Sequence, residues 1–225
     1  MWKKIEFAIV LLLLAVLIMM SNHLEEMVSS GRVTGRNPCI VLDSGHGGED
    51  PGKIGVNQAK EKDVNLKIAK KTKERLEKRW KVVMTREKDV MLGDPAAGNK
   101  KIHDMKARVE RINKTMPQAA VSIHQNSYQD AQIHGAQVFY YSHSEEGKRM
   151  AEVMQKALLK ADEENTRQAK ANDTYYLLKR TEVPTIIVEC GFLSNPEEAA
   201  KLVSPKYQEK LAEAIAEGIL ACMEN

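Results

Sequence analysis

The sequence predicts a single α/β layered domain with a central, largely parallel sheet. Short apolar runs typical of buried strands alternate with segments in which apolar residues recur every three or four positions, as on one face of a helix. Strands that alternate with helices in this way form a sheet covered by helices. The length of 225 residues fits one such domain plus a short appendage, and no internal repeat interrupts the pattern.

The first predicted strand, Cys39 to Leu42, ends in a glycine-rich turn. This strand is a short, β-branched-rich apolar run, and the residues DSGHGG follow directly after it. Because glycine permits backbone conformations that a side chain forbids, the turn can present His46 at the end of the strand. Ligands of α/β folds bind beyond the carboxyl ends of the strands. Taken alone, His46 is equally well explained as a turn histidine with a satisfied hydrogen bond.

The middle of the chain continues the alternation. A helix is expected from Glu61 to Trp80, because its apolar residues lie three and four positions apart, opposite a face of Lys, Glu and Arg. A third apolar strand, residues 119–123, is followed at once by His124, so a histidine again stands at a strand exit. Between these segments we expect a strand at 81–85, a loop at 87–101 and a helix at 104–113.

The remaining segments complete the sheet and its covering helices. In chain order we expect a strand at 136–141, a helix at 145–160, a loop at 162–174, a short strand at 175–178, a strand at 184–189, a short helix from 195 and a final helix at 205–223. Asn195 is the expected cap of the short helix, with Pro196 at its first position. The strand before it ends in Glu189, which is unexpected, because burying a charge without a partner is costly.

The N-terminus carries an apolar segment. Residues 7–20 are an unbroken apolar run behind two lysines. The run is shorter than the roughly 20 residues of a membrane-spanning helix, but it fits the core of a signal sequence. Residues 1–21 are therefore expected to be a cleaved signal peptide or an uncleaved signal-anchor, with the rest of the chain outside the cytoplasmic membrane. Residues 22–37 are expected to be a polar linker, and residues 38–225 to form the folded α/β domain.

Charge and cysteine content exclude two classes of function. A net charge of +3, without a basic stripe interleaved with aromatic residues, argues against a nucleic-acid partner. The three cysteines are an odd number at irregular spacing, so neither a disulfide framework nor a cysteine-based zinc site is expected. Cys39 and Cys190 lie in strand-like runs and are expected to be buried thiols.

Four polar residues occupy related positions in this pattern. His46, His124 and Glu189 each follow a buried strand, and Glu61 begins the helix after the first loop. If the strands are neighbours, these groups meet at one edge of the sheet. Two histidines and a carboxylate form a catalytic zinc site with one open position, and zinc lowers the pKa of bound water to about 7. Glu189, on a rigid strand end, is the candidate general base.

Each of these residues also has a purely structural interpretation. Glu61 can be a helix N-terminal charge favoured by the helix dipole. His124 can be a strand-end histidine with a backbone partner. The other histidines are expected to be ordinary surface residues: His23, His103, His134 and His143.

Six blocks of sequence, in this order, resemble one known family: IVLDSGHGGEDPG, EKDVNLKIAKK, VVMTREKD, VSIHQNS, GAQVFYY and PTIIVECGFLSNPEEA. They cover nearly everything from residue 39 to residue 222, and they resemble the zinc-dependent N-acetylmuramoyl-L-alanine amidases of the Amidase_3 type. Within that family the sporulation amidases are the most similar, given the short N-terminal apolar segment, the lack of added wall-binding repeats and HQNS in place of a HAN-type sequence. The departure at Gln125 bears on substrate preference.

The resemblance implies a mostly parallel sheet of about six strands flanked by helices. It implies zinc on His46, Glu61 and His124, with Glu189 catalytic, and it identifies no substrate-binding residue. The implied reaction cleaves the amide between the lactyl group of N-acetylmuramic acid and L-alanine of the peptidoglycan stem peptide, in spore cortex maturation before muramic-δ-lactam forms. Two alternatives stay open: a zinc peptidase acting on the stem peptide, and a non-catalytic wall-binding protein with the same fold.

The same resemblance sets expectations for partners and location. Peptidoglycan is the expected partner, together with an accessory protein that helps the small domain bind zinc or substrate. The domain is expected to act outside the cytoplasm, either secreted or anchored to the outer face of the cytoplasmic membrane. Contact with the membrane is expected only through the N-terminal segment.

Overall fold

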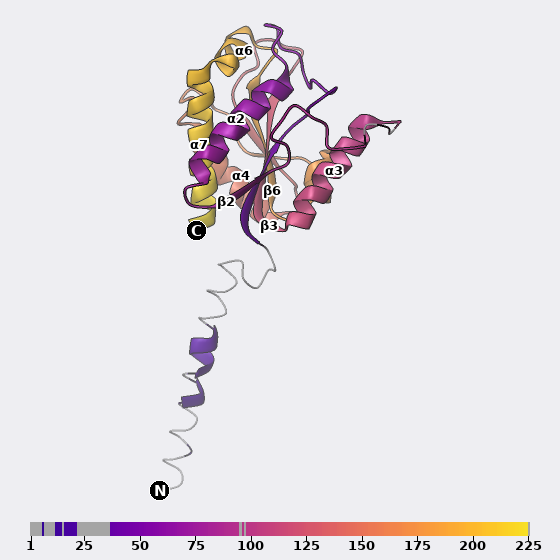
Figure 1. Ribbon diagram of the computed structural model, residues 1–225. Coiled ribbons are helices and arrows are strands. Elements are labelled where there is room, and N and C mark those ends of the chain that lie inside the picture. Colours follow the sequence, from indigo (N-terminus) through magenta and orange to yellow (C-terminus); the bar gives the residue numbers. More distant parts are fainter. Residues whose placement is uncertain are drawn as a thin grey trace. The chain divides into compact units, whose positions relative to one another are not determined.

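One mixed sheet forms the centre of the domain in the computed structural model, which describes residues 6, 12–14, 16–21, 37–94, 96 and 98–224. Its strands are β1 (Asn37–Ser44), β2 (Lys81–Met84), β3 (Pro117–Asn126), β4 (Gln137–Tyr140), β5 (Lys170–Ala171) and β6 (Thr185–Phe192). The strand order is β2-β1-β3-β6-β4-β5. Figure 1 shows the sheet between α2 and α7 on one side and α3 on the other. Strand β4 runs antiparallel to β6, whereas β1 with β2, β3 with β6 and β4 with β5 are parallel. The predicted α/β domain with a mostly parallel sheet is confirmed.

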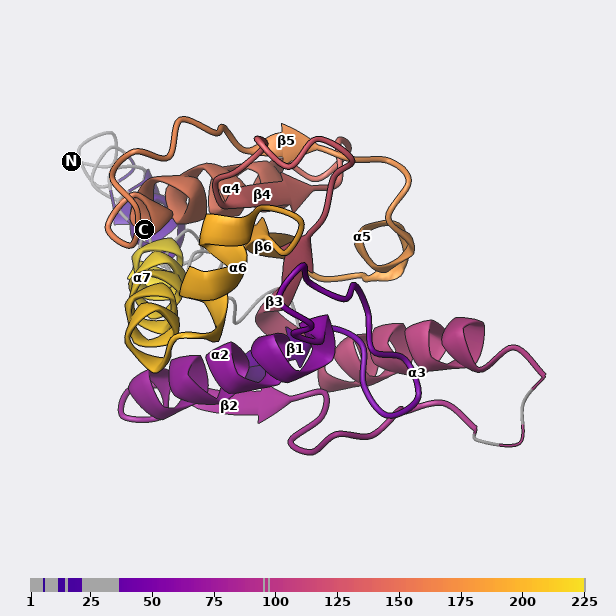
Figure 2. The same ribbon diagram turned by 90° about the horizontal axis from the view of Figure 1, so that it is seen from above.

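Helices cover both faces of the sheet. On one face lie α2 (Glu61–Leu76), α4 (Glu145–Leu158), α6 (Pro196–Val203) and α7 (Pro205–Glu224). On the other face lie α3 (Lys100–Thr115) and the short α5 (Tyr176–Arg180). Figure 2 shows the two groups of helices on opposite sides of the sheet. Both α3 and α5 contribute residues to a cleft on that face of the sheet.

Strand periodicity divides the apolar residues between two cores. In β1, Ile40 and Leu42 belong to the large core under α2, α4 and α7, whereas Val41 belongs to the smaller core under α3 and α5. In β6, Val188 faces the large core and Ile187 the small one. Because successive side chains point to opposite faces, the parity of a position decides which layer of helices its side chain meets.

One predicted element is wrong. Residues 175–178 were expected to form a strand, and they form the start of helix α5, while the short strand β5 lies within the predicted loop. Tyr and Leu favour either structure, and the side chain of Asn172 decides between them: its Oδ1 accepts hydrogen bonds from the backbone N–H of Thr174 and of Tyr175 and turns the chain into the helix. The helix is anchored by Leu177 and Leu178, which are both buried.

Two helix boundaries also differ from expectation. Helix α3 begins at Lys100, earlier than predicted, because the Asn99 side chain accepts the N–H of Ile102 and caps it. Helix α2 ends at Leu76 and is shorter than predicted. The expected burial of Cys39 and Cys190 is confirmed.

The N-terminal segment forms a unit separate from the domain. Its residues 12–14 and 16–21 are helical, and their side chains are exposed. No helix in the described part of the chain is long and apolar enough to cross a bilayer. Residues 22–36 of the predicted linker lie outside the described residues, and Asn37 belongs to β1. The signal or anchor interpretation of residues 1–21 stays a prediction.

Candidate metal centre

Strand pairing places His124 beside Glu189. The two residues are register partners on the parallel neighbours β3 and β6. Both stand an even number of residues from core positions under α3 and α5, His124 from Ala120 and Glu189 from Ile187. Their side chains therefore leave the sheet on the same face, at the ends of adjacent strands.

The glycine turn after β1 brings His46 to the same place. His46 has φ 61°, a left-handed conformation that is uncommon for residues with a side chain. A Cβ on Gly45 would lie 2.1 Å from Cε1 of His124, so only glycine lets the turn pass over that ring. The two imidazole rings meet edge to face, with centroids 5.1 Å apart.

Two buried arginines hold this strained turn in place. Arg108 of α3 donates to the carbonyl oxygens of Ser44 and His46, and Arg86 donates to those of Ser44 and Gly45. Arg108 is itself neutralised by Asp43, at 2.6 Å, and by Asp104, at 2.7 Å.

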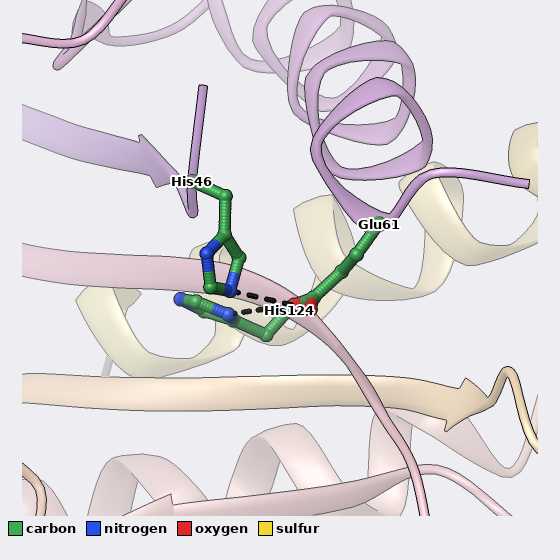
Figure 3. Close-up of side chains that lie close together, drawn as sticks. All are labelled: His46, Glu61 and His124. Atoms are coloured by element: carbon green, nitrogen blue, oxygen red, sulfur yellow. Dashed lines mark hydrogen bonds and ion pairs between the residues drawn. The ribbon is translucent and has the colours of Figure 1, made fainter. Parts of the chain in front are cut away.

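Helix α2 supplies the carboxylate. Glu61 is its first residue, and the side chain is buried between the two histidines. Its Oε1 lies 2.9 Å from Nδ1 of His124, and its Oε2 lies 3.2 Å from Nε2 of His46 (Figure 3). The backbone N–H groups of Lys53 and Gln125 also donate to this carboxylate, so it is fixed from several sides.

This cluster has the composition of a metal site. One ligand atom from each of His46, Glu61 and His124 lies within 4.8 Å of the others. Two imidazole nitrogens and a carboxylate oxygen are the donors of many catalytic zinc sites. The structure thus brings together all three residues predicted as ligands. His103, His134 and His143 do not belong to the cluster, and His23 lies outside the described residues.

The charges of the cluster reinforce one another. Burial opposes ionisation of Glu61, but the hydrogen bonds from His124 and His46 hold its pKa well below the usual range. Burial would likewise lower the pKa of His124, but the Glu61 carboxylate raises it. Such pairing keeps Glu61 anionic, as a ligand must be.

Glu189 is set apart from this pairing. Burial, which outweighs the attraction of the His124 imidazole, raises the pKa of Glu189 to about 7. Its Oε2 is buried without a hydrogen-bond partner in the described structure. A carboxyl group that titrates near neutral pH beside the candidate metal ligands has the property required of a general base.

Asp50 is a functional residue that the sequence reasoning missed. Its Oδ2 accepts a hydrogen bond from Nδ1 of His46 at 2.7 Å, which leaves Nε2 facing Glu61. A carboxylate behind a ligand histidine fixes the ring and its tautomer. An acidic residue four positions after His46, in the same glycine-rich turn, was the available signal.

These groups share one cleft of about 380 Å³. The cluster residues and Glu189 line this cleft, and so do Met105 of α3, Tyr175 just before α5 and Leu177 of α5, among others. An open cleft at the carboxyl ends of the strands gives a substrate direct access to the cluster.

Comparison with known proteins defines the class. The family model described as N-acetylmuramoyl-L-alanine amidase, Amidase_3, matches residues 40–221. The chain belongs to this family and is an amidase, which confirms the resemblance of the sequence blocks.

Individual relatives narrow the comparison. The germination-specific N-acetylmuramoyl-L-alanine amidase of Bacillus subtilis strain 168 is 40% identical over 185 residues, covering 80% of this chain and 78% of that protein. The CwlD amidase of Clostridioides difficile, solved in complex with the GerS lipoprotein, has a TM-score of 0.80 and 37% identity, covering 84% of this chain and 99% of that one. The catalytic domain of CwlV from Bacillus (Paenibacillus) polymyxa var. colistinus has a TM-score of 0.74 and 29% identity, with the same coverage. The chain is thus similar to amidases of the CwlD type.

Proposed function

We propose that this amidase is zinc-dependent and cleaves the amide between the lactyl group of N-acetylmuramic acid and L-alanine of the stem peptide. The observation that carries the proposal is the cluster of His46, Glu61 and His124 beside the unpaired carboxyl of Glu189, in one open cleft. The donor set suits zinc, because it is borderline in softness and contains no thiolate.

Metal binding and proton transfer are assigned to different residues of the site. His46, Glu61 and His124 would hold zinc, which would supply polarisation of the amide carbonyl and a lower pKa for bound water. Glu189 accepts a proton from the water molecule that attacks the carbonyl carbon. It then returns the proton to the alanine nitrogen as the C–N bond breaks, so it ends the cycle ionised. A pKa of about 7 lets one carboxyl group perform both transfers near neutral pH.

Two variants separate metal binding from proton transfer. Glu189→Gln should keep zinc but lose turnover about 100- to 10,000-fold, because general-base catalysis is worth that much. Glu61→Gln should lose zinc, measured by metal analysis of the purified chain. Glu182→Gln, an exposed glutamate, is the control and should behave as wild type. Wild-type turnover by Glu189→Gln would contradict its role.

Product mass tests the bond that is cleaved. The full-length chain with zinc should release the intact stem peptide, with a free L-alanine amine, from a defined muropeptide. Release of shorter peptides would favour the alternative zinc peptidase, and no turnover by the zinc-loaded chain would favour a non-catalytic wall-binding role.

The biological setting extends the same proposal. We infer a role in spore cortex maturation and germination outside the cytoplasm, with residues 1–21 as signal peptide or membrane anchor. This inference is supported by the similarity to the germination-specific amidase of B. subtilis and to CwlD. Because the C. difficile CwlD was solved with a lipoprotein, an accessory protein is a reasonable second partner beside peptidoglycan. Analysis of cortex muropeptides from a deletion strain tests the proposed role in cortex maturation. The strain should lack muramic-δ-lactam.

A further inference from the structure

Tyr175 lines the catalytic cleft, and its hydroxyl takes no part in the hydrogen bonds of the described structure. It precedes helix α5, and its side chain lines the cleft together with the metal cluster and Glu189. Its backbone N–H is held by Oδ1 of Asn172 at 2.9 Å, and its backbone oxygen accepts from Lys179. The phenol hydroxyl makes no hydrogen bond with any residue that the structure describes.

The ring of Tyr175 is fixed even though the hydroxyl is unpaired. It packs edge to face on Phe139, with ring centroids 5.5 Å apart and an interplanar angle of 87°. It also packs against the small core that contains Leu177 and Ile187. A ring held in this way is fixed in the lining of the cleft, and such preorganisation is what transition-state stabilisation requires.

The hydroxyl is a hydrogen-bond donor at every pH at which the enzyme would work. Burial, together with the carboxylates of Glu189 and Glu61, raises the pKa of Tyr175 to about 12. The same two carboxylates line the cleft together with Tyr175. A half-buried tyrosine hydroxyl normally finds a partner, and here only the contents of the cleft are left to provide one.

We propose that Tyr175 is a further catalytic residue, whose hydroxyl donates a hydrogen bond to the carbonyl oxygen of the scissile amide as negative charge develops there. No proton is transferred from the phenol. The inference rests on the proposed amide hydrolysis, because that reaction creates a negative oxygen within reach of the groups that line the cleft. Hydrogen-bond donors of this kind contribute mainly to kcat, since the charge that they stabilise is absent in the bound substrate.

The substitution Tyr175→Phe removes the hydroxyl and keeps the ring contact with Phe139. We expect kcat on a defined muropeptide to fall about 100- to 1,000-fold, as for other donors to a developing oxyanion. KM, zinc content and the pH dependence of kcat/KM should stay at wild-type values. Tyr141→Phe is the matched control, because Tyr141 packs against the same small core but does not line the cleft.

Other results would overturn the inference. Wild-type kcat for Tyr175→Phe would make the hydroxyl dispensable. A rise in KM alone would mean that the hydroxyl binds the substrate in the ground state. Loss of zinc would mean that the hydroxyl supports metal binding. A shift of the acidic limb of the kcat/KM profile would mean that the hydroxyl acts through Glu189. The wild-type chain assayed in parallel tests the proposed function separately: if it hydrolyses the muropeptide and Tyr175→Phe is equally active, only the role of Tyr175 fails.

Discussion

Removal of Arg108 should destabilise the molecule strongly. Its side chain is fully buried, and it links helix α3 to the end of strand β1 next to the candidate metal site. It donates to Asp43 at 2.6 Å, to Asp104 at 2.7 Å and to the carbonyl oxygens of Ser44 and His46 at 2.8 and 2.5 Å. Replacement by Met keeps the volume but leaves two buried carboxylates without their cation.

The expected cost follows from that burial. Removing one partner of a buried ion pair destabilises a protein by about 3–5 kcal/mol, because the remaining charge is left uncompensated. This is a large share of the roughly 5–15 kcal/mol by which domains are stable. Adding Asp43→Asn should relieve part of the damage, so the double variant should be less destabilised than the sum of the single variants by about 1–3 kcal/mol.

Urea unfolding followed by circular dichroism measures all four free energies of this double-mutant cycle. Arg111→Met is the control: Arg111 is exposed on the same helix, and its loss should change the free energy of unfolding by less than about 0.5 kcal/mol. A loss below about 1 kcal/mol for Arg108→Met, or strictly additive effects with Asp43→Asn, would refute the argument from buried charge.

Two further predictions concern the groups around the cluster. Asp50→Asn should weaken zinc binding about 10- to 100-fold, measured by competition with a chelator, because the variant loses the carboxylate that orients His46; the exposed Asp63→Asn should bind as wild type, and equal affinities would contradict the role of Asp50. Although burial opposes it, the Arg108 guanidinium, helped by Ser122 and Thr85, lowers the pKa of Asp43 to about 2 from 3.8. Asp43 therefore contributes stability that is complete above about pH 4 and is lost as the pH falls toward 2, about 2 kcal/mol in all. Urea titrations at pH 5 and at pH 2 measure the free energy of unfolding of both proteins. The decrease between these pH values should be about 2 kcal/mol smaller for the Asp43→Asn variant than for wild type. An equal decrease in the two proteins would show that Asp43 is not paired as described.

Much of this molecule could be predicted from local pattern. The apolar runs identified β1, β3 and β6, and the alternation of strands with helices indicated the layered sheet, because burial of one face imposes its period on the residues. The residues at the strand exits, His46, His124 and Glu189, were candidates because a polar group after a buried run needs a reason to be there. Local pattern failed at residues 175–178, where the turn formed by the side chain of Asn172 outweighed strand propensity.

Sequence by itself identified the candidate residues for the chemistry and the elements at whose ends they lie. Tertiary structure alone decided that β1, β3 and β6 lie together in the sheet and that His124 pairs in register with Glu189. It also brought Arg108 into contact with the backbone of His46 and Asp50 into contact with its ring. Tyr175 was placed by the same packing in the lining of the cleft. The physical reason is that strand order, register and side-chain contacts arise from contacts between residues far apart in the chain, whereas propensity and periodicity report only on the conformation of near neighbours.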